Sequence, residues 1–414
     1  MPTTAPAPAS RPRAALDLLG LLDPAAGLVR VHSVEPPGTA GDGLWRVAIQ
    51  LACPHPPPTS DTALTTCVTG ACALTRRDAL VRAVGEAVER LALHSGPEAD
   101  PATAPSYDGS GDALHAPLHR PVRRYAGTRV RDGAELLVPA GLVDYPAESE
   151  RPEFDPGPSG TASGIGHDQA LRSALLETVE RDAIIVSWTR RLRTRAVDVD
   201  GLLADGPPDA SWRRVSALLD LVRAGGMQPV LAELPLSVPG LVCVVGGVRV
   251  ETGTGPAVCV GAKVSDDPGH AVAGALEESL QLYRSLLAVR AAATEPPPSV
   301  ITGDNDRLAF LASPRGAASV AEWLADPLPS TYPLSLPRLG TDELLAALVA
   351  DGLDPIVLDL SDRLPERVRA MGWSVVKVVP AGYQPLRIDE RTTYGWNERR
   401  LGPGERCPDP HPLP

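Results

Sequence analysis

The chain has 414 residues, 43% hydrophobic and 22% charged, which is typical of a globular protein with one large domain or two or three packed lobes. Its formal net charge of −12 argues against a nucleic-acid partner, because the phosphates would be repelled. No hydrophobic run is long enough to span a membrane, and no signal peptide is recognisable. The six cysteines include no CxxC pair, so we expect free thiols in a reducing cytoplasm and no zinc site at Cys67 and Cys72.

The N-terminal half alternates between strand-like and helical stretches. Residues 1–15 are rich in Pro and Ala and are expected to form a disordered tail. The pattern then predicts a short helix and turn (16–30), strands (44–53, 63–68 and 135–144), a helix with Thr75 as its N-cap (75–94) and another helix that begins near His167. Loops are expected at 96–123 and 146–164.

The C-terminal half repeats a unit of strand, loop and helix, which predicts an α+β fold for residues 16–402. Strands are predicted at 229–234, 241–250, 257–263, 355–360 and 373–379, and helices at 211–224, 268–292, 341–351 and 362–371. The region between 296 and 339 is poorly patterned. Residues 403–414 form a Pro-rich tail that ends in PHPLP, and it is expected to be extended because alternate prolines do not allow a helix.

Two helical segments, Ala79–Arg90 and Ala170–Arg181, align without a gap at an offset of 91 residues, and each ends in ExxER. A weaker third copy begins at Ala271. The polar residues of the repeat are Glu86, Glu89 and Arg90 in the first copy, Glu177, Glu180 and Arg181 in the second, and Glu278 and Gln281 in the third. The repeat therefore predicts three equivalent helices turned toward a common centre.

Carboxylates and guanidinium groups at one place suggest a nucleoside triphosphate held through Mg²⁺. Mg²⁺ prefers oxygen ligands and joins carboxylates to phosphates, and arginine pairs with phosphate oxygens. The alternative is that Glu86/Arg90 and Glu177/Arg181 are surface ion pairs four residues apart, each worth roughly a few tenths of a kcal/mol. The repeat and the apolar residues around it favour the nucleotide site.

Four segments of the chain resemble the YcaO family: 69–92, 159–188, 355–386 and the terminal PHPLP. The resemblance extends from about Leu16 to the end. It implies a YcaO-like fold in which repeated strand–helix units carry glutamates around a central nucleotide site. YcaO proteins are ATP- and Mg²⁺-dependent enzymes that activate backbone amides of peptides. Members that end in PxPxP resemble cyclodehydratases, which convert Cys, Ser or Thr of a ribosomally made precursor peptide to thiazoline or oxazoline by phosphorylating the amide oxygen.

The same resemblance assigns roles to individual residues. Metal ligands would be Glu86, Glu89, Glu177 and Glu180, and contacts to the nucleotide would come from these four and from Arg90, Ser159, Arg181, Glu278, Gln281 and Arg284. Arg181 would contact the transferred phosphate, and the carboxylate of Pro414 would enter the active site as a base.

The chain departs from the family pattern at two positions. Ala71-Cys72-Ala73 stands where the family usually has GKG, and Ser159 stands where it usually has Asn. A thiol does not replace a lysine as a phosphate counterion, although the hydroxyl of Ser159 can still offer an oxygen. Cys72 could be a catalytic nucleophile or a small buried core residue. The second role is favoured, because the sequence places no histidine near Cys72.

Three functions therefore remain open. The first is azoline formation with a precursor peptide and a separate ThiF-like or leader-recognising partner, since the YcaO-like region uses up the chain; a homodimer is a further possibility. The second is thioamide or macroamidine formation, which uses the same activation with another nucleophile. The third is a degenerate, non-catalytic scaffold that binds peptide, which the missing Lys and Asn favour and the clustered glutamates oppose.

Overall fold

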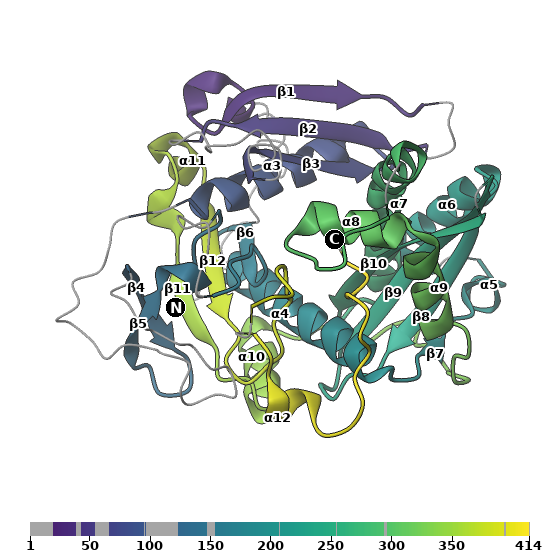
Figure 1. Ribbon diagram of the computed structural model, residues 1–414. Coiled ribbons are helices and arrows are strands. Elements are labelled where there is room, and N and C mark those ends of the chain that lie inside the picture. The colour runs from purple at the N-terminus through teal and green to yellow at the C-terminus, as the bar shows by residue number, and fades with distance from the viewer. Residues whose placement is uncertain are drawn as a thin grey trace, which may run out of the picture.

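The computed structural model describes residues 20–38, 43–53, 66–94, 96, 123–146, 154–206, 208–253, 255–293, 296–392 and 395–413. The expected N-terminal tail and Pro414 lie outside these residues. Within the described part of the chain, strands form three antiparallel sheets, and helices pack between and around them (Figure 1). The α+β fold class expected from the sequence is thereby confirmed.

In each sheet, one edge strand is followed directly in the chain by one of the three repeated helices. The first sheet has the order β1 (Val29–Glu35), β2 (Trp45–Leu51), β3 (Val68–Ala73) and leads into α3 (Arg76–Ala92). The second has the order β5 (Glu135–Pro139), β4 (Arg124–Arg129), β11 (Ile356–Asp359), β12 (Trp373–Val379), β6 (Thr161–Ile165) and leads into α4 (His167–Arg190). The third has the order β10 (Gly255–Ser265), β9 (Val242–Thr252), β8 (Gln228–Leu234), β7 (Arg195–Ala196) and leads into α7 (Pro268–Ala292).

The remaining helices cover these sheets and the chain ends. They are α5 (Val199–Leu202), α6 (Ala210–Ala224), α8 (Asp304–Ala312), α9 (Pro314–Trp323), α10 (Thr341–Ala350), α11 (Glu366–Ala370) and α12 (Glu398–Leu401). Short 3₁₀ turns lie at Pro24–Ala26, Ala140–Leu142 and Ser361–Arg363. No helix among the described residues is long and apolar enough to cross a membrane.

The three repeated helices are joined in a closed ring. Each packs on the strand that precedes it and also contacts an edge strand of another sheet: α3 contacts β6, α4 contacts β10, and α7 contacts β3. One hydrogen bond marks each joint, from Ser163 Oγ to Gly85 O (2.8 Å), from Val264 N to Glu180 Oε2 (3.1 Å) and from Gln281 Nε2 to Gly70 O (3.5 Å). The helices thus face a common centre, as the repeat predicts.

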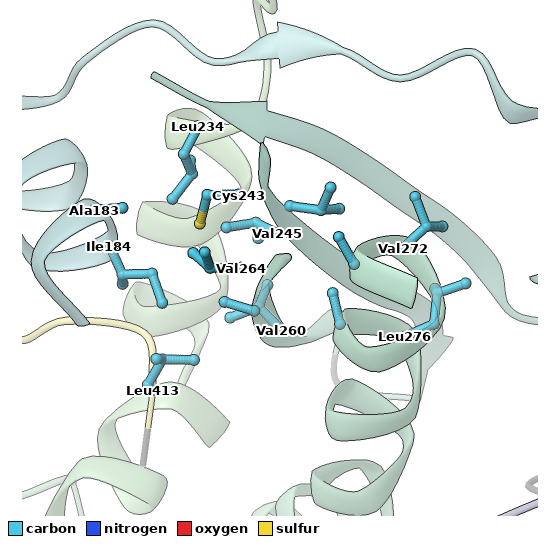
Figure 2. Close-up of a cluster of buried hydrophobic side chains, with 14 of the residues drawn as sticks. Ala183, Ile184, Leu234, Cys243, Val245, Val260, Val264, Val272, Leu276 and Leu413 are labelled. Carbon is cyan, nitrogen blue, oxygen red and sulfur yellow. The ribbon is translucent and has the colours of Figure 1, made fainter. Parts of the chain in front are cut away.

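The largest core lies between α4, α6, α7 and the third sheet. Figure 2 shows part of it, in which Ile184 of α4, Val260 of β10 and Leu276 of α7 belong to one cluster of buried side chains. Gly261 allows the close approach of α7, because a Cβ at this position would lie 2.5 Å from Cβ of Glu278 and 2.7 Å from the carbonyl oxygen of Ala275. A second core lies between α3, the first sheet and the second sheet.

The C-terminal segment follows α4 back into the molecule (Figure 1). Arg400 of α12 forms three hydrogen bonds with the carboxylate of Asp182, at 3.0, 3.1 and 2.8 Å. Further along, Trp188 Nε1 donates to Asp409 O at 2.9 Å. Leu413 is only 3% exposed and lies beside Ile184 in the core (Figure 2). The described part of the tail, 403–413, contains neither helix nor strand, as its prolines predict.

Several element predictions were wrong or incomplete. The strand expected near 63–68 runs from Val68 to Ala73, which places Cys72 within β3. Of the helix and turn expected at 16–30, residues 16–19 lie outside the described residues; residues 20–30 contain helical residues at Gly20 and Leu21, a 3₁₀ turn and the start of β1. The helix expected at 362–371 is reduced to a 3₁₀ turn and α11. The strands β1, β4 and β6 and the helices α8 and α9 were missed. Gly127 weakens the strand pattern of β4, and Pro314 divides the apolar pattern between α8 and α9.

Candidate active site

The first glutamate pair projects from α3 toward the centre of the ring. Glu86 accepts a hydrogen bond from Arg90 Nε at 2.8 Å, and both side chains are partly buried. Burial raises the pKa of Glu89 well above its usual value, and the negative charges of Glu86 and Glu177 raise it further. Glu89 therefore lies among carboxylates from two different helices, which is the convergence that the repeat predicts.

The second pair, on α4, is held by an arginine and by the edge of the third sheet. Arg181 forms ion pairs with Glu177 at 3.2 Å and with Glu180 at 3.5 Å. Glu180 is 2% exposed and accepts the backbone N–H of Val264. Burial raises the pKa of Glu177, and the charge of Glu180 adds to this effect while Arg181 opposes it. In this pair, the single positive charge of Arg181 is therefore shared between two carboxylates.

The third helix contributes Glu278 but not its predicted neighbours. Glu278 accepts the backbone N–H of Ala262 at 2.7 Å, and burial together with the charge of Glu180 raises its pKa. Gln281 and Arg284 are exposed, and Arg284 pairs with Glu35 at 3.3 Å. The structure thus brings Glu278 beside the other carboxylates, whereas Gln281 and Arg284 lie on an exposed part of α7.

The chain contains only two lysines, and both lie in this site. Lys263 of β10 is 3.4 Å from Glu180 Oε2, and this carboxylate raises the pKa of Lys263. Lys377 of β12 donates to the carbonyl oxygens of Gly157 (2.9 Å) and Ser159 (2.8 Å). Burial lowers the pKa of Lys377 to about 8, although the charges of Glu177 and Glu89 oppose this shift. Sequence reasoning missed both residues; their rarity beside 37 arginines (39 − 2) was an available signal.

A small cavity of about 60 Å³ opens beside these groups and is lined by Ser159, Arg181, Lys377 and Asp155, among others. Gly160 lets the chain pass close to β12, since a Cβ there would lie 2.5 Å from the carbonyl oxygen of Val378. Asp155 was also missed from the sequence. Burial raises its pKa to about 6, although backbone N–H groups of Asp389 and Ile388 donate to it.

The position of the missing family lysine is occupied by a buried thiol that an arginine contacts. Cys72 is 4% exposed, and Arg46 Nη1 donates to its Sγ at 3.1 Å. Arg82 donates to the carbonyl oxygen of Cys72 and pairs with the buried Glu277 of α7 at 2.5 Å. Cys72 is therefore a packed core residue, as the sequence favoured, and the cations at this joint are arginines.

The residues present fit a metal ion with phosphates. Five glutamates from three helices meet at the centre, and Glu89, Glu177 and Glu278 have raised pKa values because they are buried near other carboxylates. A divalent cation with oxygen preference would relieve this repulsion. Nε of Arg181 is buried and has no hydrogen-bond partner among the described residues, so a donor remains for an anion beside the carboxylates.

A family model described as YcaO cyclodehydratase, ATP- and Mg²⁺-binding, matches residues 70–384, which is more than half of the chain. The chain belongs to the YcaO family. The resemblance read from the sequence is thus confirmed, and the family description names the two cofactors expected from it. A search of curated proteins by sequence found no match.

Solved structures agree with the YcaO fold. YcaO from Methanopyrus kandleri bound with AMPPCP and Mg²⁺ is 18% identical, with a TM-score of 0.63 over 92% of this chain and 95% of that chain. A heterocyclase in complex with substrate and cofactor is 17% identical, with a TM-score of 0.69 over 97% of this chain, which spans only 57% of that heterocyclase. The E. coli microcin synthetase McbBCD complex with pro-MccB17 bound is 12% identical, with a TM-score of 0.58 over 84% of this chain and 87% of that chain. At these identities the likeness shows the fold alone.

The tail of this YcaO protein approaches the same site. His411 is buried, Arg307 Nη1 donates to its carbonyl oxygen at 3.5 Å, and its imidazole contacts the carbonyl oxygen of Arg387. Burial lowers the pKa of His411 well below its usual value, and the positive charges of Arg307 and Arg181 contribute to this shift. His411 therefore lies within electrostatic reach of Arg181.

Proposed function

We propose that this YcaO protein is an ATP- and Mg²⁺-dependent cyclodehydratase that forms thiazoline or oxazoline from Cys, Ser or Thr of a precursor peptide. The observation that carries the proposal is the meeting of five glutamates from three helices with Arg181 and Lys377 beside a cavity. Carboxylates of this kind hold Mg²⁺, and the metal neutralises phosphate charge when it is bound.

In the proposed reaction, the protein holds and orients the precursor peptide and ATP. The substrate thiol or hydroxyl adds to the carbonyl carbon of the preceding amide and gives its proton to a base. The resulting oxyanion takes the γ-phosphate of ATP, and ADP leaves. Loss of phosphate with the amide proton then forms the C=N bond of the azoline. Arg181, Arg90 and Lys377 would hold the phosphates in place and stabilise the charge that develops during transfer.

The two lysines also compensate for the positive charge that is lost at Cys72, where the family usually has a lysine. Lys377 and Lys263 reach the site from β12 and β10, so positive charge is supplied there by strands other than β3. We assign the phosphate contact of the missing family lysine to Lys377, because it lines the cavity together with Ser159 and Arg181. Ser159 would then contribute its hydroxyl to the same ligand.

The tail is proposed to complete the site. Leu413 is buried in the core, and His411 is within reach of the charge of Arg181, which supports entry of PHPLP into the active site. The next residue, Pro414, would bring its carboxylate near the reacting amide as the base. A separate ThiF-like or leader-recognising protein would deliver the precursor peptide.

Thermal unfolding with and without Mg²⁺ and ATP tests the nucleotide site without any knowledge of the peptide. A ligand at about a hundred times its Kd, bound only to the folded state, should stabilise by roughly 2.7 kcal/mol. We expect this shift to require Mg²⁺, to be lost in Glu177→Gln and to persist in Glu35→Gln, whose carboxylate is exposed. Absence of a shift in the wild-type chain would favour the non-catalytic scaffold.

Turnover with peptide and partner separates the remaining functions by mass and by amine labelling. Azoline and macroamidine formation each remove one water, whereas thioamide formation exchanges oxygen for sulfur. A macroamidine also consumes an amine, so loss of one amine-reactive group identifies it and retention of that group identifies an azoline. If ATP is not hydrolysed with precursor peptide and partner present, the enzymatic proposal should be abandoned.

A further inference from the structure

A second group of metal-binding side chains lies outside the glutamate site. Cys53 follows β2, Cys67 precedes β3, and His94 follows α3; their side chains are 9%, 7% and 8% exposed. One ligand atom from each residue lies within 4.8 Å of the other two. Three segments that are distant in the sequence thus bring two thiols and an imidazole to one buried point.

These three groups have the chemistry of a zinc site. Zn²⁺ takes thiolate sulfur at about 2.3 Å and imidazole nitrogen at about 2.0 Å, almost always with four ligands in a tetrahedron. Two sulfurs on one such ion are about 3.8 Å apart. The sulfurs of Cys53 and Cys67 lie 2.6 Å apart, so one sulfur would move by about 1 Å, through rotation of its side chain, when the ion binds.

An imidazole beside the two thiols favours a metal over a simple pair of core cysteines. Both cysteines belong to the core between α3 and the first two sheets, and neither a core pair nor a disulfide would use the nitrogens of His94. The backbone at His94 is also fixed, because Arg363 Nη1 donates to the carbonyl oxygens of His94 (3.0 Å) and Ala92 (3.2 Å) and pairs with Asp144. The ring of His94 is therefore presented from a rigid position.

We propose that Cys53, Cys67 and His94 bind one Zn²⁺ ion, with water in the fourth position, and that this ion fastens the end of α3 to the β2–β3 edge. His94 lies four residues beyond Arg90, so the ion would anchor the helix that carries Glu86 and Glu89 without taking part in the nucleotide site. The sequence spacing concealed this group, since Cys53 and Cys67 are 14 positions apart and form no CxxC motif.

Metal analysis of the untagged full-length chain, purified under reducing conditions without chelator, tests the proposal. We expect about one zinc per chain, falling below about 0.1 in Cys67→Ser and in His94→Ala. Cys407→Ser is the control, because this thiol is the least buried of the six and lies outside the group; its zinc content should equal that of the wild type.

A second measurement on the wild-type chain guards against variants that do not fold. After removal of zinc by a chelator, added Co²⁺ should give the near-ultraviolet absorption of cobalt–thiolate charge transfer, and the melting temperature should recover. A chain that carries no stoichiometric zinc and gives no such band overturns the proposal. Zinc retained in Cys67→Ser overturns it as well, as does resistance of Cys53 and Cys67 to alkylation until a reductant is added, since that identifies a disulfide.

Discussion

The unequal environments of the two lysines predict unequal reactivity toward a reagent that attacks neutral amines. Lys377 has a pKa of about 8 because it is buried, whereas Glu180 raises the pKa of Lys263 above the ordinary 10.5. At pH 7 roughly 10% of the Lys377 side chains would be neutral, against less than about 0.03% of those of Lys263. The neutral fraction therefore differs by roughly 300-fold. A less basic amine is also a weaker nucleophile, so we expect Lys377 to react at least about tenfold faster.

Cyanate is a suitable reagent, because it is small enough for the cavity that Lys377 lines, and it carbamylates only neutral amines. The chain has no other lysine, so two peptides read by mass spectrometry report both rates in one sample. Mg²⁺ and ATP together should slow the modification of Lys377, since phosphate contact keeps the amine charged and fills the cavity. ATP without Mg²⁺ should protect less.

Lys377→Met serves as the reference, because it removes one peptide signal and leaves the rate at Lys263 as a measure of general reactivity. Equal rates at the two lysines, or an inert Lys377, would refute the assignment of its environment. Rapid modification that Mg²⁺ and ATP do not slow would refute its role as a phosphate contact, while leaving the pKa argument in place.

Three further predictions concern stability. The pKa of Asp155 is raised from 3.8 to about 6, so between these pH values the folded state binds more protons than the unfolded state. The free energy of unfolding should therefore fall by up to about 3 kcal/mol as the pH rises from 4 to 6. Denaturant unfolding of Asp155→Asn should lack most of this pH dependence. Leu413→Ala, which empties a buried position, should cost about 2 to 3 kcal/mol in the same assay, and a loss no larger than that of the exposed Leu334→Ala would contradict the docked tail. Asp182→Asn should lower the free energy of unfolding by about 2 to 4 kcal/mol, because it breaks the partly buried ion pair with Arg400. Asp326→Asn, at an exposed ion pair, is the control and should have almost no effect. An equally small effect of Asp182→Asn would show that this pair does not hold α12.

The sequence predicted the glutamate helices because their signal is local. Helical spacing, an N-cap at Thr75 and a gapless repeat are contained within short segments, and the observed bounds of α4 and α7 begin at His167 and Pro268 as expected. The inward direction of Glu89 and Glu177 followed from the apolar residues around them. Of the third helix, the structure places Glu278 beside the other carboxylates and leaves Gln281 and Arg284 exposed, since a repeat does not reveal where a helix leaves the centre.

The remaining site residues could not be read from local patterns. Lys263 and Lys377 lie on strands of different sheets, and their positions beside the glutamates depend on how those sheets meet. Asp155 belongs to an irregular segment whose path is fixed by contacts with residues more than 200 positions away, such as Ile388. Only the assembled chain defines these neighbours.

The closed ring of helices and sheets has a consequence for how the protein is made. Since α3 rests on β6, α4 on β10 and α7 on β3, no strand–helix unit has all of its partners until the other two are present. The second sheet is incomplete until β11 and β12, which follow α7 in the chain, have joined it. Such long-range pairing slows folding and makes it cooperative. Fragments cut between the units should therefore be unable to bind nucleotide separately, and a defect at one joint should be transmitted to the carboxylates of all three helices.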